Sequence, residues 1–316
     1  MSFFASRRSA WAMLLMATVF SLPAQVRPNS TPMEIIHGKP YVMVLVNGRG
    51  PFRFVIDTGT GGQALVTPEL ADRLELPVVG QARLTDPSGQ GGQRAQVVQV
   101  DSLQVAGVEF AGIRAIRHGL AGEDESCMGV LGFTLFRDYL LTLDYPNRRM
   151  ALNAGALEAD GERSVLPFRM PEGVPIVSLH IGSLRVDGQI DSGGDGLSLP
   201  AKLASRLKFA VDPVDFALGQ SFSTRFHLKS AKLASDVRLG GYTFTRPFVE
   251  INPAFPLANF GSCPLQNFAV TFDQRNLLVR LDAAQKELHL GTTPKAIRLR
   301  NEPARKPPPP DLVPVG

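Results

Sequence analysis

The sequence resembles itself at a spacing of about 130 residues, and this internal similarity restricts the chain to two related halves. A shift of 134 positions aligns Gly48, Ile56, Asp57, Gly59, Gly107 and Phe110 with Gly182, Ile190, Asp191, Gly193, Gly241 and Phe244. A shift of 133 positions aligns Leu70, Ala71, Arg73 and Leu74 with Leu203, Ala204, Arg206 and Leu207. Because the spacing drifts only between segments, as loop insertions in a duplicated domain would cause, we expect two lobes and not a solenoid of short repeats.

The end of each half aligns in two alternative ways. A shift of 129 positions pairs Gly132, Thr142, Asp144 and Asn147 with Gly261, Thr271, Asp273 and Asn276. A shift of 138 positions instead matches RDYLLTLD with RNLLVRLD. We prefer the first alignment because it preserves a glycine.

The local patterns predict strands and hairpins, with little helix. The 30 glycines and 25 prolines divide the chain into short segments, which favours an all-β fold. Residues 42–46 and 52–56 are β-branched or aromatic runs around an Asn47-Gly48 turn, and residues 176–190 repeat this pattern around Gly182. Leucines at helical spacing predict a short helix in PELADRLEL and in AKLASRLKF.

Each half places an aspartate after an apolar strand and before a tight turn, in FVIDTGT at 54–60 and GQIDSGG at 188–194. One such motif is commonly an Asx turn without chemistry. Two at equivalent points of a duplicated domain would meet at the pseudo-twofold axis. Like charges that close cannot both ionise, so Asp57 and Asp191 would share a proton.

These two motifs, with GVLGF at 129–133 and a weaker copy, ANFGS at 258–262, resemble the pepsin and retropepsin aspartic peptidases. The resemblance covers residues 39–294 and is nearest in style to the exported bacterial two-lobe aspartyl protease family proteins. It implies an all-β, bilobal pepsin-like fold, with two homologous β-barrel lobes and a short helix after each aspartate turn.

The resemblance also implies an active cleft between the lobes. Asp57 and Asp191 would be catalytic, one as general base on a water and the other as the acid that polarises the scissile carbonyl, with no metal or organic cofactor. Supporting roles would fall to the turn residues Thr58, Gly59, Thr60, Ser192, Gly193 and Gly194, with Thr58 and Ser192 hydrogen-bonded across the axis. A glycine-rich flap that contacts the substrate would include Ser88, Gly89, Gly91 and Gly92.

Three departures from the family pattern affect these expectations. Gly194 stands where Thr60 of the first lobe has a hydroxyl, so we expect Asp191 to have the higher pKa and to hold the proton. The flap candidate is glycine-rich and has no aromatic residue, and in this it resembles the retroviral-type members of the family more than the pepsin-like ones. Asn259 replaces an aliphatic residue in the second apolar-glycine element, which weakens its expected support of Asp191; Asp195 is interpreted as a turn residue.

The two ends of the chain differ from its body. Arg7 and Arg8 precede an apolar run, which predicts a signal peptide at residues 1–24 and export to the periplasm or the medium. We expect an N-terminal extension at 25–38, lobes at 39–155 and 168–294, and a Pro-rich basic tail at 295–316. The net charge of +4 comes from these ends, so the sequence suggests no nucleic-acid partner, and no later run is long enough for a stable membrane span.

Two questions stay open from the sequence. Cys127 and Cys263 are the only cysteines, and they form either one disulfide or two unpaired thiols; the five scattered histidines are interpreted as structural. The function is either that of an exported, monomeric endopeptidase acting on extended peptides or unfolded proteins, or that of a peptidase-like module that binds a peptide or cell-envelope ligand without cleaving it. Gly194 and the weak second apolar-glycine element favour the binding module.

Overall fold

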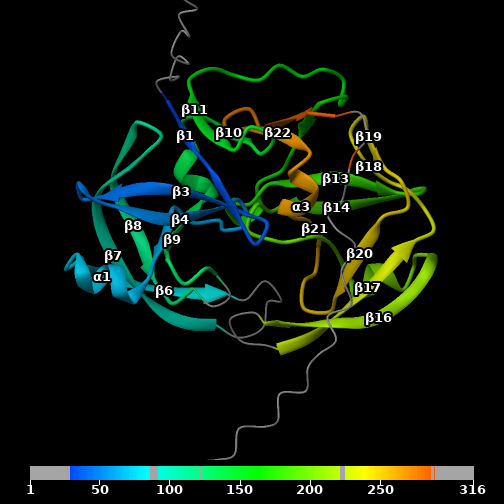
Figure 1. Ribbon diagram of the computed structural model, residues 1–316, viewed down its shortest axis with the longest axis horizontal. Coiled ribbons are helices and arrows are strands. Elements are labelled where there is room, and N and C mark those ends of the chain that lie inside the picture. The colour runs from blue at the N-terminus through cyan, green and yellow to red at the C-terminus, as the bar shows by residue number, and fades with distance from the viewer. Residues whose placement is uncertain (1–28, 86–91, 121–122, 221–224, 286–287, 289–316) are drawn as a thin grey trace, which may run out of the picture.

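A computed structural model describes residues 29–85, 92–120, 123–220, 225–285 and 288 of the 316. The described chain is mostly β, with two lobes side by side and a third sheet that joins them (Figure 1). The predicted signal peptide and tail, and the flap candidates Ser88, Gly89 and Gly91, lie outside the described residues. None of the described helices is long and apolar enough to cross a membrane.

The first lobe is an eight-stranded sheet in the order β2-β3-β4-β9-β5-β8-β7-β6, and β3 also pairs with β7. Its strands are β2 Glu34–Ile36, β3 Lys39–Val46, β4 Arg49–Asp57, β5 Ala64–Val66, β6 Val78–Thr85, β7 Gly92–Val105, β8 Val108–Arg117 and β9 Cys127–Gly132. The helix α1 spans Pro68–Arg73 and the 3-10 turn η1 spans Phe133–Phe136.

Local sequence explains how this lobe begins. Asn47 and Gly48 have φ of 50° and 69°, the left-handed conformation that these residues tolerate best, and the predicted hairpin of β3 and β4 is confirmed. Thr67 caps α1 by accepting a hydrogen bond from the Leu70 amide at 3.1 Å, with Pro68 at the first helical position. The helix ends at Arg73, which is earlier than the leucine pattern predicted.

The second lobe is a nine-stranded sheet in the order β16-β17-β20-β15-β21-β14-β13-β18-β19. Its strands are β13 Ile176–Ile181, β14 Leu184–Ile190, β15 Leu197–Pro200, β16 Phe209–Gln220, β17 Arg225–Leu233, β18 Val237–Leu239, β19 Tyr242–Phe244, β20 Phe248–Asn252 and β21 Ala258–Phe260. The short helices are η2 Pro171–Gly173, α2 Ala201–Ala204 and α3 Ser262–Leu265. As in the first lobe, a short helix follows the aspartate turn.

A six-stranded sheet contains strands from both halves, in the order β1-β11-β10-β22-β23-β12. Its strands are β1 Ser30–Pro32, β10 Leu140–Asp144, β11 Arg149–Asn153, β12 Val165–Pro167, β22 Phe268–Asp273 and β23 Leu278–Ala283. At its centre β10 pairs antiparallel with β22, Thr142 lies opposite Thr271, and their hydroxyl oxygens are 3.0 Å apart. Of the residues matched by the shift of 129, Thr142 and Thr271 lie opposite each other in this pairing.

The cysteines are both free thiols, one buried at position 127 and one half-buried at position 263. The structure therefore selects the unpaired alternative. Burial raises the pKa of both thiols, which disfavours the reactive thiolate form.

Candidate active site

The two aspartates end equivalent strands on either side of the boundary between the lobes. Asp57 is the last residue of β4, which runs parallel to β9, and Asp191 directly follows β14, which runs parallel to β21. In register, Asp57 lies opposite Gly132, and Ile190 lies opposite Phe260. The apolar-glycine elements of the sequence are therefore the strands beside the aspartates.

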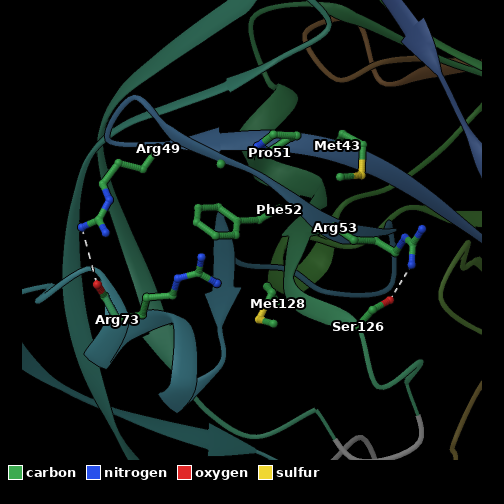
Figure 2. A pocket seen from close by; sticks show the side chains of 9 residues that line it. Met43, Arg49, Pro51, Phe52, Arg53, Arg73, Ser126 and Met128 are labelled. Carbon is green, nitrogen blue, oxygen red and sulfur yellow. Dashed lines mark hydrogen bonds between the residues drawn. The ribbon is translucent and has the colours of Figure 1, made fainter.

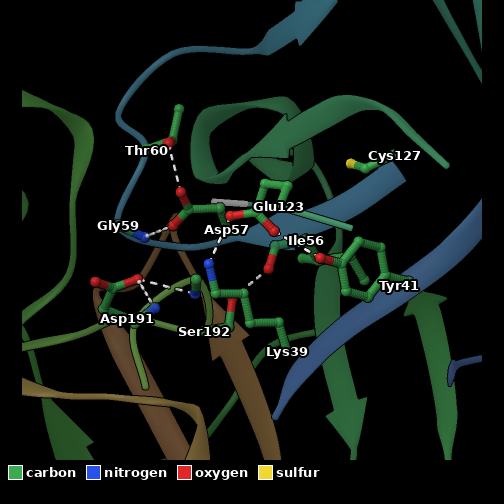
Figure 3. Close-up of polar contacts among 12 residues, drawn as sticks. Lys39, Tyr41, Ile56, Asp57, Gly59, Thr60, Glu123, Cys127, Asp191 and Ser192 are labelled. Atoms are coloured by element: carbon green, nitrogen blue, oxygen red, sulfur yellow. Dashed lines mark hydrogen bonds and ion pairs between the residues drawn. The ribbon is translucent and has the colours of Figure 1, made fainter. Parts of the chain in front are cut away.

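Thr58 and Ser192, both fully buried, connect the two aspartate turns (Figure 3). The Thr58 amide donates to Ser192 Oγ at 3.0 Å, and the Ser192 amide donates to Thr58 Oγ1 at 3.0 Å. The Thr58 hydroxyl donates to the Ile190 carbonyl at 2.8 Å, and the Ser192 hydroxyl donates to the Ile56 carbonyl at 2.7 Å. These reciprocal bonds satisfy buried polar groups and hold the turns together across the axis.

Gly59 and Gly193 allow each turn to lie against the opposite carboxyl group. A Cβ atom on Gly193 would lie 2.5 Å from Cγ of Asp57, and one on Gly59 would lie 2.6 Å from Cγ of Asp191. Neither separation is possible between real atoms, so only glycine fits at either position. The two carboxyl groups thus face the same small space.

The two carboxyl groups accept different sets of hydrogen bonds. Asp57 accepts from the Gly59 amide and from the Thr60 hydroxyl, each at 2.7 Å. Asp191 accepts from the amides of residues 193 and 194 at 2.9 and 3.0 Å, and its Oδ2 accepts from Nδ2 of Asn259 at 2.6 Å. Asp191 thus accepts one hydrogen bond more than Asp57, and its side-chain donor is an amide where that of Asp57 is a hydroxyl.

The two carboxyl groups of the site interact electrostatically. Burial, followed by the charge of Asp191, raises the pKa of Asp57 to about 7. The sequence analysis placed the proton on Asp191 because Gly194 has no hydroxyl. The structure changes the premise of that expectation, because the Asn259 side chain supplies a donor in place of that hydroxyl.

The second apolar-glycine element supports its aspartate turn as the first one does. The amides of Gly132 and Phe133 donate to the carbonyls of Gln63 and Thr60, each at 2.9 Å. In the second lobe the amides of residues 261 and 262 donate to the carbonyls of residues 196 and 194 at 2.9 and 2.8 Å. The weaker sequence match therefore did not indicate a loss of backbone support.

A charged pair that the sequence analysis did not single out also lies near the aspartates (Figure 3). Nζ of Lys39 lies 2.5 Å from Oε1 of Glu123, Tyr41 donates to the other oxygen of that carboxylate at 2.6 Å, and both charged side chains are 15% exposed. Burial alone would lower the pKa of Lys39, but the hydrogen bond and charge of Glu123 raise it above its ordinary value. The two residues are 84 positions apart, so no local sequence pattern indicates the pair.

Asn259 is the other site residue whose role the sequence analysis missed. A signal was present, since the second lobe lacks a hydroxyl at position 194 and gains an amide at position 259. We interpreted the two as separate departures. Of the flap candidates, only Gly92 is described, and it begins β7.

A separate cavity of about 380 Å³ lies on the first lobe, beside β4 and α1 (Figure 2). Phe52 forms its floor and the guanidinium of Arg73 lies 5.4 Å from the centre of that ring. Neither aspartate lines this cavity, so it is not part of the candidate active site. Among the residues that the structure describes, no three His, Cys, Asp or Glu side chains are grouped as a metal site would require.

Two β lobes that each contribute one aspartate to a shared site define an aspartic-protease-like fold. In agreement, residues 42–135 match the family model described as aspartyl protease. This match spans most of the first lobe, including Asp57 and the first apolar-glycine element, and supports assignment of the chain to the aspartyl protease superfamily with a protease-like role. No curated protein matches the chain.

Proposed function

We propose that this protein is an exported aspartic endopeptidase in which Asp57 and Asp191 activate a water molecule to hydrolyse peptide bonds. The observation that supports this most directly is the pair itself: each carboxyl group lies against the glycine of the opposite turn, and the charge of Asp191 contributes to the raised pKa of Asp57. Two acids that affect each other in this way hold one proton between them over a range of pH.

In the proposed mechanism Asp191 is the general base and Asp57 is the general acid. The ionised Asp191 takes a proton from the water as its oxygen attacks the carbonyl carbon, while the protonated Asp57 donates to the carbonyl oxygen. Asp191 then gives the proton it took from the water to the amide nitrogen, and the carbon–nitrogen bond breaks. As the new carboxylic acid forms, one hydroxyl of the tetrahedral intermediate returns its proton to Asp57, so the pair again holds one proton. Burial and the charge of Asp191, which raise the pKa of Asp57, support the role of Asp57 as the acid, and the Asn259 donor supports the role of Asp191 as the base.

The substrate we propose is an extended peptide or an unfolded protein that binds between the lobes. Because one chain supplies both aspartates, the site needs no second copy of the protein, which supports a monomer. Export rests on the predicted signal at residues 1–24. The features that favoured a non-cleaving binding module were Gly194 and Asn259, and the donor that Asn259 supplies to Asp191 favours hydrolysis instead.

The experiment is incubation of the purified protein with a reduced, unfolded protein between pH 3 and 8, with the fragments identified by mass spectrometry. Asp57→Asn and Asp191→Asn should each reduce cleavage to background. Each variant keeps only one carboxyl group, so it cannot share one proton between two acids. The matched control is Asp187→Asn. It removes a carboxylate from β14, the strand that precedes Asp191, where Asp187 forms an exposed ion pair with Arg169, and this variant should cleave normally. Absence of cleavage by the parent protein, or retained cleavage in either dyad variant, would contradict the proposal.

A further inference from the structure

Two sequence departures of the second lobe lie at one point of the structure. In the first lobe Thr60 supplies a hydroxyl to Asp57, and the residue two positions before Gly132 of β9 is the apolar Val130. In the second lobe the corresponding residues are Gly194 and Asn259. The first has lost a hydrogen-bond donor and the second has gained one.

Asn259 makes the kind of hydrogen bond to Asp191 that Thr60 makes to Asp57. Nδ2 of Asn259 lies 2.6 Å from Oδ2 of Asp191, and the hydroxyl of Thr60 lies 2.7 Å from Oδ2 of Asp57. Strand β21 holds the amide in place, because Asn259 pairs with Gln189 on one side and Ser198 on the other, at the centre of the nine-stranded sheet. Each aspartate thus has one side-chain donor, but the donors come from different strands and turns.

The two departures also depend on each other sterically. A Cβ atom on Gly194 would lie 2.9 Å from Oδ2 of Asp191 and 3.0 Å from Nδ2 of Asn259. A side chain at position 194 and the amide at position 259 therefore compete for the same space. Glycine at one position makes room for asparagine at the other.

The orientation of the Asn259 amide is linked to the charge of Asp191. With its nitrogen toward Asp191, the Asn259 amide donates a hydrogen bond to a carboxylate. With the amide turned over, the Asn259 oxygen would face an Asp191 oxygen, and this arrangement suits only a protonated Asp191. The Asn259 oxygen is buried and accepts no hydrogen bond within the described part of the chain. A buried polar atom left unpaired is uncommon, and it is consistent with an amide positioned for its nitrogen.

We propose that Asn259 is a positioning residue that replaces the missing hydroxyl of position 194 and keeps Asp191 ionised, so that Asp191 serves as the general base. The catalytic part of this inference rests on the proposed function. The inferred effect of Asn259 on the charge of Asp191 does not depend on the proposed function.

Other charged and titratable groups also act on this site and must stay constant in any comparison. The groups whose charges act on Asp191 or on its partner acid are Asp57, Asp195, Tyr145 and Lys39, and Lys39 is itself paired with Glu123. Substitutions limited to positions 194 and 259 leave all of these groups in place.

The first experiment is the pH dependence of kcat/KM in Asn259→Leu, a variant of similar size that cannot donate. Loss of one hydrogen bond to a charged group should move the acid limb of the profile to higher pH by about one to two units. The double variant Gly194→Thr with Asn259→Val rebuilds the arrangement of the first lobe and should return the acid limb toward that of the parent. An unchanged acid limb in Asn259→Leu, or a shift that the double variant fails to reverse, would overturn the proposal.

The second experiment does not require activity. Carbon-13 NMR of aspartate carboxyl groups follows the ionisation of Asp191, whose signal is identified by its loss in Asp191→Asn. In Asn259→Leu its midpoint should rise, and circular dichroism should report a retained fold. If the parent fails to cleave but this midpoint moves, the endopeptidase proposal fails and the effect of Asn259 on Asp191 stands; if the midpoint does not move, the role of Asn259 is refuted.

Discussion

Glu250, on the strand β20, is expected to reduce the stability of the protein at neutral pH. Its carboxyl group lies close to the loop that follows Asp191, since a Cβ atom on Gly196 would lie 3.0 Å from Oε1 of Glu250. Burial, followed by the charge of Asp195, raises the pKa of Glu250 from 4.5 to about 7. Between these two values the folded protein keeps a proton that the unfolded chain releases, so the free energy of unfolding falls as the pH rises from about 4.5 to 7.

The size of the effect follows from the difference in pKa. At about 1.4 kcal/mol per unit, the shift corresponds to about 3 kcal/mol of lost stability above pH 7. Glu250→Gln removes the ionisable group and keeps the shape of the side chain. This variant should therefore be more stable than the parent by up to about 3 kcal/mol at pH 8, with little difference at pH 4.

The measurement is urea unfolding followed by circular dichroism at pH 4 and pH 8. Glu109→Gln, which removes an exposed glutamate from β8, is the matched control and should behave like the parent at both values. A gain in Glu250→Gln that is equal at pH 4 and pH 8 would refute the reasoning, because it would not come from ionisation. A loss of stability at pH 8 would refute it as well.

Three further predictions concern the aspartate turns. Cleavage should decline above about pH 7, where Asp57 loses its proton, and a pH profile that still rises at pH 8 would contradict that assignment. Gly193→Ala should reduce kcat/KM by roughly 100-fold or more, measured with a fluorogenic peptide, because its Cβ atom would displace the carboxyl group of Asp57. Ser192→Ala should lower the free energy of unfolding by about 1–3 kcal/mol for each partner left unpaired, measured in urea, and an unchanged midpoint would show that the cross-axis bonds add no stability.

The fold was predictable from the sequence to the extent that local patterns and internal similarity determine it. The Asn47-Gly48 turn predicted the first hairpin because few other residues adopt its backbone angles. The shift of 129 matched Thr142 with Thr271, which lie opposite each other in the shared sheet. The pairing of β1 with β11 had no such signal, because a three-residue strand acquires its partner only in the folded chain.

The candidate site was predictable in its backbone and less so in its electrostatics. The motifs at 54–60 and 188–194 indicated which residues form the turns. Their glycines allow a tight turn, and their aspartates accept hydrogen bonds from the buried amides of the turn. The expectation about the proton compared only residues within each motif and therefore left out the donor Asn259, which is 68 residues from Asp191. The pair of Lys39 and Glu123 escaped notice for the same reason.

The shared sheet has a mechanical consequence for the way a peptide could enter. Strands β10 and β22 are paired along their full overlap, from Leu140 opposite Asp273 to Asp144 opposite Ala269. Swinging the halves apart would break this backbone ladder, so the shared sheet opposes any change in the spacing of the two aspartates. The relative position of the two acids is thus set by continuous backbone pairing between the halves.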